Sequence, residues 1–210
     1  MSAKSSLLGI IKQSAYLFAF SLALAMPTSS ALACACCADA GDRHISTVPI
    51  DAYNKDILNS FRFAREASLY LTADEEQSRG IINPDDSYDY FVDVNLAGEN
   101  WVFSFSDQPG NVGTLTLAAG SLMRESAIDT KPETQTSDSY SPVELYKEFE
   151  LSGAVSATGI FAPGYTDLLV GHLVFHGLGN GCSDASQFTN WTLSVTGPET
   201  DFRFFGKLAN

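Results

Sequence analysis

The chain has 210 residues, with 25 acidic and 12 basic side chains and a formal net charge of −13 at pH 7. This acidic balance argues against binding to nucleic acid or to anionic membrane surfaces, because clustered Lys and Arg recognise both. The length suits one domain with a proper hydrophobic core. Composition therefore excludes partners and does not identify one.

Residues 1–33 show the parts of a secretory signal. Two lysines precede an almost wholly apolar run at 15–26, and Ala-Leu-Ala at 31–33 gives the small-x-small pattern that signal peptidase accepts. The apolar run is shorter than the roughly 20 residues that a membrane-spanning helix needs. We therefore expect 1–33 to be a cleaved signal peptide. Residues 34–210 are then an exported domain, periplasmic or extracellular, with no transmembrane segment.

Cleavage after Ala33 would place Cys34 at the front of the mature chain, as in a bacterial lipoprotein. Lipoprotein signals usually have a large aliphatic residue three places before the cysteine, and here that place holds Ala31. We favour an unmodified N-terminus and keep a lipid anchor at Cys34 as the alternative.

The first predicted element after the cysteines is one short helix over residues 52–62. Asp51 fits the N-cap position. Apolar side chains then recur at near-helical spacing at Tyr53, Ile57, Leu58 and Phe61.

Further along the chain, β-forming residues alternate with polar ones, which predicts strands. The predicted strands are 68–72, 88–96, 101–107, 113–118, 146–152, 154–161, 168–176, 191–196 and 202–208. The polar stretch 128–142 is interpreted as a disordered loop. Short strands at this spacing predict an all-β domain of about eight to ten strands, an antiparallel β-sandwich or β-barrel with one short N-terminal helix.

The aromatic side chains lie mostly at strand spacing, which indicates a core. They are Trp101, Phe103, Phe105, Trp191, Phe202, Phe204 and Phe205. An exposed subset would instead bind a sugar or an apolar ligand at a barrel mouth.

All four cysteines belong to the predicted domain: Cys34, Cys36 and Cys37 in the segment 34–42, and Cys182 far along the chain. An even number in an exported chain first indicates disulfides. A bond from one of the three N-terminal cysteines to Cys182 would close a loop of roughly 145 residues and stabilise the fold by about 4–5 kcal/mol in the chain-entropy model. A ring between Cys36 and Cys37 would be strained, so that pairing is disfavoured.

The alternative use of these thiols is a metal site, since thiolates favour copper(I) and zinc. His44 follows the cysteine cluster, and His172 and His176 precede Cys182. Two residues four apart share a face of a strand or helix. The spacing fits no standard zinc motif, so we expect no cofactor, with copper or zinc as the alternative.

No sequence motif marks a catalytic residue: Gly-x-Ser-x-Gly and His-Glu-x-x-His are absent. The first hypothesis is therefore an exported cell-envelope binding or structural module of unknown ligand, stabilised by disulfides. A periplasmic thiolate protein for copper or zinc is the alternative. An exported hydrolase that uses acidic residues, or Cys182 with His176, is the third.

Overall fold

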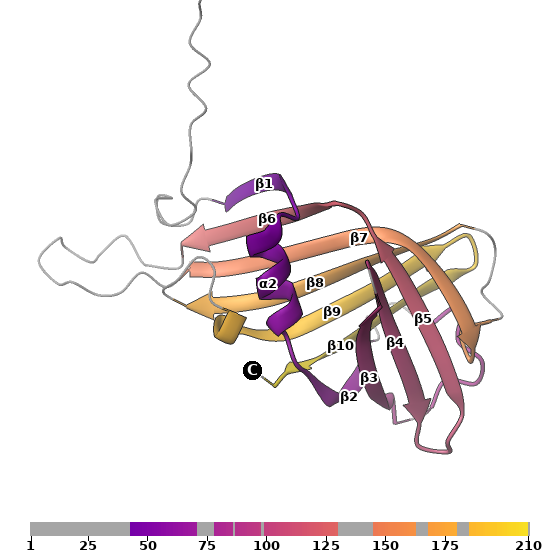
Figure 1. The fold of residues 1–210 in the computed structure, drawn as a ribbon. Helices are drawn as coiled ribbons and strands as arrows, with labels where there is room; N and C mark the ends of the chain where they lie inside the picture. Colours follow the sequence, from indigo (N-terminus) through magenta and orange to yellow (C-terminus); the bar gives the residue numbers. More distant parts are fainter. Residues whose placement is uncertain are drawn as a thin grey trace, which may run out of the picture. The chain divides into compact units, whose positions relative to one another are not determined.

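The computed structural model describes residues 43–70, 78–85, 87–97, 99–129, 145–162, 168–179 and 185–209. The expected signal peptide and all four cysteines lie outside these ranges, so the disulfide prediction stays a prediction. Figure 1 shows the described elements. They are β1 (Arg43–Pro49), α2 (Ala52–Ser60), β2 (Phe63–Tyr70), β3 (Asp89–Ala97), β4 (Asn100–Asp107), β5 (Val112–Ala119), β6 (Leu122–Asp129), β7 (Leu145–Gly159), β8 (Leu169–Gly179), η3 (Ala185–Gln187), β9 (Phe188–Gly197) and β10 (Thr200–Leu208).

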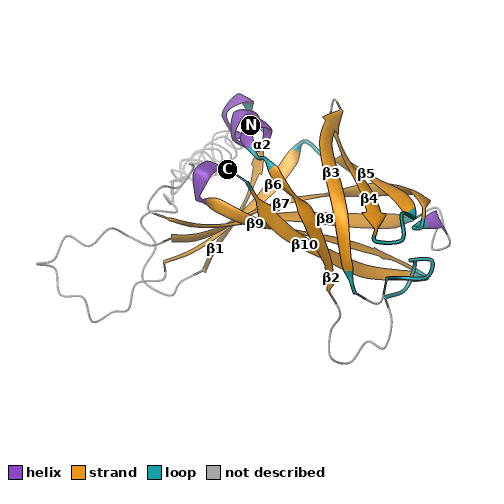
Figure 2. Cartoon of the chain, turned by 90° about the horizontal axis from the view of Figure 1, so that it is seen from below, coloured by secondary structure: helices purple, strands orange, loops and turns teal. Residues whose placement is uncertain are grey.

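Eight of these strands form a closed antiparallel barrel, which confirms the all-β prediction and decides for the barrel over the sandwich. Around the wall the order is β2, β3, β4, β5, β7, β8, β9 and β10, and β10 pairs with β2 to close the ring (Figure 2). Strands β6 and β1 extend the sheet beyond the ring at one end of β7 (Figure 1). Closure protects the backbone edges of all eight strands.

Strand β7 is paired along both edges. One edge pairs with β8, and the other pairs with β5 over residues 153–159 and with β6 over residues 145–150. Strands β5 and β6 therefore follow each other along the same edge, with an interruption at Gly120 and Ser121. The sheet branches at this point: β5 pairs with β4 and continues the barrel, whereas β6 pairs with β1 and forms the extension.

Gly153 is the residue that lets β7 continue through this junction. A Cβ atom at this position would overlap the carbonyl oxygen of Ala118, a backbone atom of β5 that has no flexible end to move aside. The prediction of two strands, 146–152 and 154–161, was therefore wrong. The glycine permits close approach of two backbones and does not end the strand.

The predicted helix is confirmed as α2, which ends at Ser60. The Asp51 carboxylate accepts a hydrogen bond from the Asn54 backbone N–H at 2.9 Å, as an N-cap does. Of the four apolar positions, Ile57, Leu58 and Phe61 are buried, whereas Tyr53 is 58% exposed and does not belong to the packed face.

Interlocking side chains fill the barrel interior. The fully buried aromatic residues are Phe103, Phe105, Phe149, Phe161, Phe175, Trp191 and Phe204. Ring centroids lie 5.8 Å apart for Phe103–Trp191 and 4.4 Å apart for Phe105–Phe204. The prediction that strand aromatics form the core is thus confirmed for most of them. Phe205 is the exception, with 46% of its surface exposed on the outer wall.

Two strands were not predicted. Strand β1 is largely exposed, and β6 carries three charged residues and a serine, so neither has the period-two pattern of a half-buried strand. Residues 128–129 belong to β6 and not to the predicted loop. Strand β8 continues through residues 177–179, beyond the predicted strand 168–176. The remainder of the predicted loop lies outside the described residues.

The Gly153→Ala substitution should weaken the barrel, because its methyl group meets the Ala118 carbonyl across the β5–β7 ladder. We expect a loss of about 2–4 kcal/mol in the free energy of unfolding, measured by urea denaturation with tryptophan fluorescence. The matched control is Gly120→Ala, where a Cβ atom would meet nothing closer than 4.0 Å. That control should change stability by less than about 1 kcal/mol. Equal effects of the two substitutions would contradict this account of the junction.

Candidate functional site

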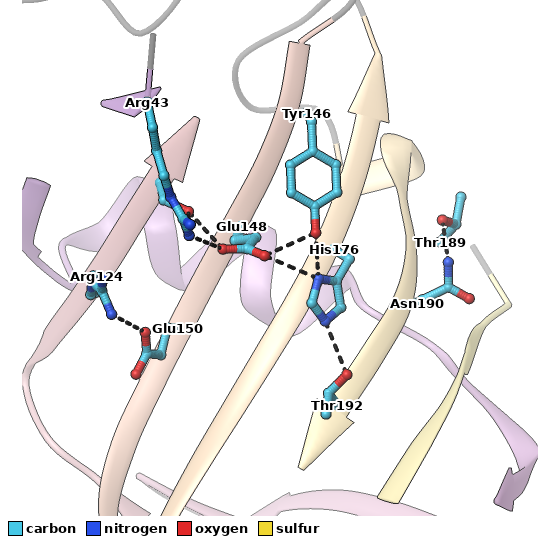
Figure 3. A network of polar contacts seen from close by, with 10 residues as sticks. Arg43, Arg124, Tyr146, Glu148, Glu150, His176, Thr189, Asn190 and Thr192 are labelled. Carbon is cyan, nitrogen blue, oxygen red and sulfur yellow. Dashed lines mark hydrogen bonds and ion pairs between the residues drawn. The ribbon is translucent and has the colours of Figure 1, made fainter. Parts of the chain in front are cut away.

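A row of polar side chains crosses the outer wall of the sheet from β1 to β9 (Figure 3). Alternation along β7 places Tyr146, Glu148 and Glu150 on this face, and the strand register sets Glu148 opposite both Ser126 of β6 and His176 of β8. We call this group the outer polar network. It consists of Arg43, Arg124, Ser126, Tyr146, Glu148, Glu150, His172, His176 and Thr192.

Glu148 is the centre of the network. Its carboxylate accepts hydrogen bonds from Ser126 Oγ at 2.7 Å, from Tyr146 Oη at 2.9 Å and from the Arg43 guanidinium at 3.0 Å. Partial burial alone would raise the pKa of Glu148, but the bonds from Ser126 and Tyr146 outweigh it and lower this pKa. The charge of Arg43 lowers it too, as does His176 at the acidic pH where its ring is protonated. The carboxylate is therefore ionised at neutral pH.

The His176 ring lies between a tyrosine and a threonine. Its Nδ1 atom is 2.8 Å from Tyr146 Oη and its Nε2 atom is 3.0 Å from Thr192 Oγ1. Because the Tyr146 hydroxyl donates its proton to Glu148, Nδ1 must donate to the tyrosine oxygen and Nε2 must accept from Thr192. Burial lowers the pKa of His176, which Glu148 only partly opposes, so the ring is neutral at pH 7.

The resulting chain of hydrogen bonds has one direction, from Thr192 through His176 and Tyr146 to Glu148. Burial, with the hydrogen bond to Glu148, raises the pKa of Tyr146 to about 12, which keeps its proton in place. Both nitrogens of His176 are engaged, so the ring offers no free lone pair for general-base chemistry. The hypothesis of a hydrolase that uses Cys182 with His176 is not tested, because Cys182 lies outside the described residues.

The other two histidines are held elsewhere. His172 shares the outer face of β8 with His176, as its spacing predicted, but its Nδ1 atom bonds to Glu150 at 2.8 Å, and Arg124 bonds to the same carboxylate at 2.9 Å. His44 alternates with Arg43 along β1, so it lies on the opposite face of the sheet from the network.

The three histidines are thus not brought to one point. Among the residues that the structure describes, no group of three or more His, Cys, Asp or Glu side chains is placed to hold a metal ion. The metal hypothesis also depends on the cysteines and stays a prediction.

A pocket of about 160 Å³ lies at the mouth of the barrel, where α2 meets the turn between β3 and β4 and the junction of β5 with β6. We call it the mouth pocket. Its apolar lining comes from Ile50, Leu58, Leu96, Trp101, Ala119 and Leu151. Two oppositely charged residues, Lys55 and Glu99, also line it and are exposed.

Sequence reasoning selected the histidines and missed the residues that surround them. The alternation Tyr-Lys-Glu-Phe-Glu at 146–150 was the available signal, since it assigns Tyr146, Glu148 and Glu150 to one face of a predicted strand. The mouth pocket had no such signal, because its lining comes from α2, the β3–β4 turn and the β5–β6 junction, which are distant in the sequence.

Comparison with known proteins assigns no family: no family model, no curated protein and no solved structure matches the chain. Over the described ranges, none of the helices has the length and apolar character needed to cross a membrane.

Acid should destabilise the barrel, because the pKa values of both His176 and Glu148 are lowered in the folded state. Below pH 6.5, the ordinary pKa of histidine, the unfolded chain binds a proton at residue 176 that the folded chain does not. The free energy of unfolding therefore decreases as the pH is lowered. Glu148 adds a further loss below its ordinary pKa of 4.5. Urea unfolding across pH 4 to 8 measures this slope, and His176→Gln should flatten the part of it that begins below pH 6.5.

The effect of Glu148 on the pKa of His176 can be tested separately, with Glu150 as the control position. In Glu148→Gln the pKa of His176 should fall further, because the carboxylate favours the protonated ring. Glu150→Gln removes the neighbouring carboxylate, which bonds His172 instead, and should leave the His176 titration near that of the wild type. Proton NMR of the imidazole resonances measures both, and equal shifts in the two variants would refute the assigned contacts.

Proposed function

We propose that the chain is an exported, non-catalytic binding module of the cell envelope, whose ligand inserts an apolar group into the mouth pocket. The observation that supports it is the combination of a packed barrel interior with an apolar concavity at its end. A concave, mostly apolar site with a few polar groups is the usual form of a small-molecule site.

The size of the pocket limits what enters it. A cavity of about 150 Å³ lined by aliphatic and aromatic side chains accepts benzene. The mouth pocket has about 160 Å³, and buried side chains line it, with Leu151 0%, Leu58 5% and Trp101 5% exposed. The inserted group is therefore about as large as a benzene ring or a branched aliphatic side chain.

The polar lining favours an amphipathic ligand. Lys55 and Glu99 place opposite charges beside the apolar lining, and Asn59 and Ser121 add hydrogen-bonding groups. Polar groups at the edge of an apolar site orient the ligand and give specificity. A ligand with one apolar group and a charged or hydrogen-bonding group beside it matches this arrangement.

Two further parts of the proposal, export and stabilisation by disulfides, rest on the sequence. The signal-like segment 1–33 and the four cysteines favour an oxidising compartment. A copper or zinc site at Cys34, Cys36, Cys37 and Cys182, or a hydrolase, stays an alternative. The outer polar network adds to neither, because its contacts satisfy His172 and His176 without a metal or a substrate.

The mouth pocket should bind small ring compounds that have one polar group, such as indole-3-acetate and benzylamine. We expect millimolar binding, seen as backbone chemical-shift changes at Leu58, Leu96 and Leu151 in a fragment screen by NMR. Ser121→Phe adds a ring to the lining and should reduce binding at least tenfold.

The matched control is Ser104→Phe, which adds the same ring to an exposed position on β4 and should leave binding unchanged. Absence of any binder in the screen, or equal binding by the two phenylalanine variants, would overturn the assignment of this pocket.

A further inference from the structure

We infer that the outer wall of β2, β10 and β9 forms a second binding site, which takes a uronate-containing saccharide through Tyr70, Phe205 and Arg203. This site is separate from the mouth pocket and does not depend on it. The ligand class follows from three observations: two exposed rings on adjacent strands, a guanidinium fixed beside them, and a hydroxyl-rich surround.

The site is a shallow hollow lined by Tyr70, Thr192, Arg203 and Phe205, with a volume of about 390 Å³. Strand register brings these residues together, because Tyr70 is opposite Arg203 and Phe205 is opposite Thr192. The two rings are 47% and 46% exposed, with centroids 6.4 Å apart and planes at 77°. Both rings are thus about half exposed, although most other strand aromatics are buried.

Arg203 is fixed beside the rings. Its Nε–H donates to Ser194 Oγ at 2.8 Å, which holds the guanidinium against β9 and uses one of its five N–H donors. A guanidinium held in this way suits the bidentate recognition of a carboxylate. Thr192 donates its proton to His176, so its oxygen offers lone pairs to a ligand hydroxyl.

The local charge favours an anion although the whole chain is acidic. Arg203 is the charged member of the four lining residues. Lys207, four residues further along β10, lies on the same face of the strand. Asp201, on that face beside Arg203, lies 3.9 Å from the guanidinium of Arg79. A carboxylate on the ligand therefore finds the Arg203 guanidinium in the hollow, in a chain whose formal net charge is −13.

The surround favours a saccharide over a protein partner. A stable protein interface buries about 800 Å² on each side and has an apolar centre depleted of charge. Here the neighbouring outward residues of β9 are hydroxyl or amide side chains, at Asn190, Ser194 and Thr196, and Ser68 of β2 donates to the Asp89 carboxylate at 3.0 Å. A pyranose ring packs its C–H face on an aromatic face and bonds its hydroxyls to such groups.

The test is isothermal titration of the full chain with hexagalacturonate and with its fully methyl-esterified form, which keeps the sugar skeleton and removes the charge. We expect hexagalacturonate to bind and the ester to bind at least tenfold more weakly. Phe205→Ala and Arg203→Gln should each weaken hexagalacturonate binding at least tenfold. Both positions are exposed, so both variants should unfold thermally close to the wild type.

Two matched variants control for the loss of a ring or a charge elsewhere. Phe91→Ala removes an aromatic ring with 50% exposure on β3, and Arg65→Gln removes a side chain with 77% exposure on β2. Both should bind hexagalacturonate as the wild type does. Ser121→Phe should also bind it normally, which separates this site from the mouth pocket.

No binding of hexagalacturonate, equal binding of the ester, or an equal loss in Phe91→Ala would each overturn the inference. Binding of unrelated proteins at this wall in place of the saccharide, abolished by Phe205→Ala, would also overturn it and would assign the hollow to a protein partner.

Discussion

The closed barrel depends on β7 being paired along both of its edges. Residues 145–155 of this strand pair with β8 on one side. On the other side residues 145–150 pair with β6 and residues 153–159 pair with β5. The β5 backbone approaches so closely at Gly153 that no side chain fits. Because one strand serves both the ring and its extension, the outer polar network and the mouth pocket both lie beside β7, and the hollow lies two strands away.

Closure also decides which faces are available for function. Inward residues of β7 such as Phe149 and Leu151 are fully buried, whereas Glu148 and Glu150 face outward between neighbours on both sides. A packed interior leaves the barrel mouth and the outer wall as the surfaces that can bind. The outer network differs from an ordinary solvated strand face because burial shifts the pKa values of Tyr146 and His176.

The outer network and the saccharide hollow share one residue, Thr192. Its hydroxyl bonds His176 at 3.0 Å and also lines the hollow beside Tyr70 and Phe205. The satisfied chain from Thr192 to Glu148 therefore orients a group of the hollow as well as joining β7, β8 and β9. The mouth pocket is built differently, since helix α2, the β3–β4 turn and the bend between β5 and β6 each supply part of its lining.

The sequence by itself determined the features that depend on near neighbours. The Asp51 cap and the alternation around Phe103 predicted a helix and an inward strand face, because capping and pleat act over a few residues. Tertiary structure decided the rest. Strand register turned Phe205 outward, paired Glu148 with His176 across β7 and β8, and made Gly153 a close contact between strands. No local pattern contains these pairings, because they depend on which strands become neighbours when the sheet closes into a barrel.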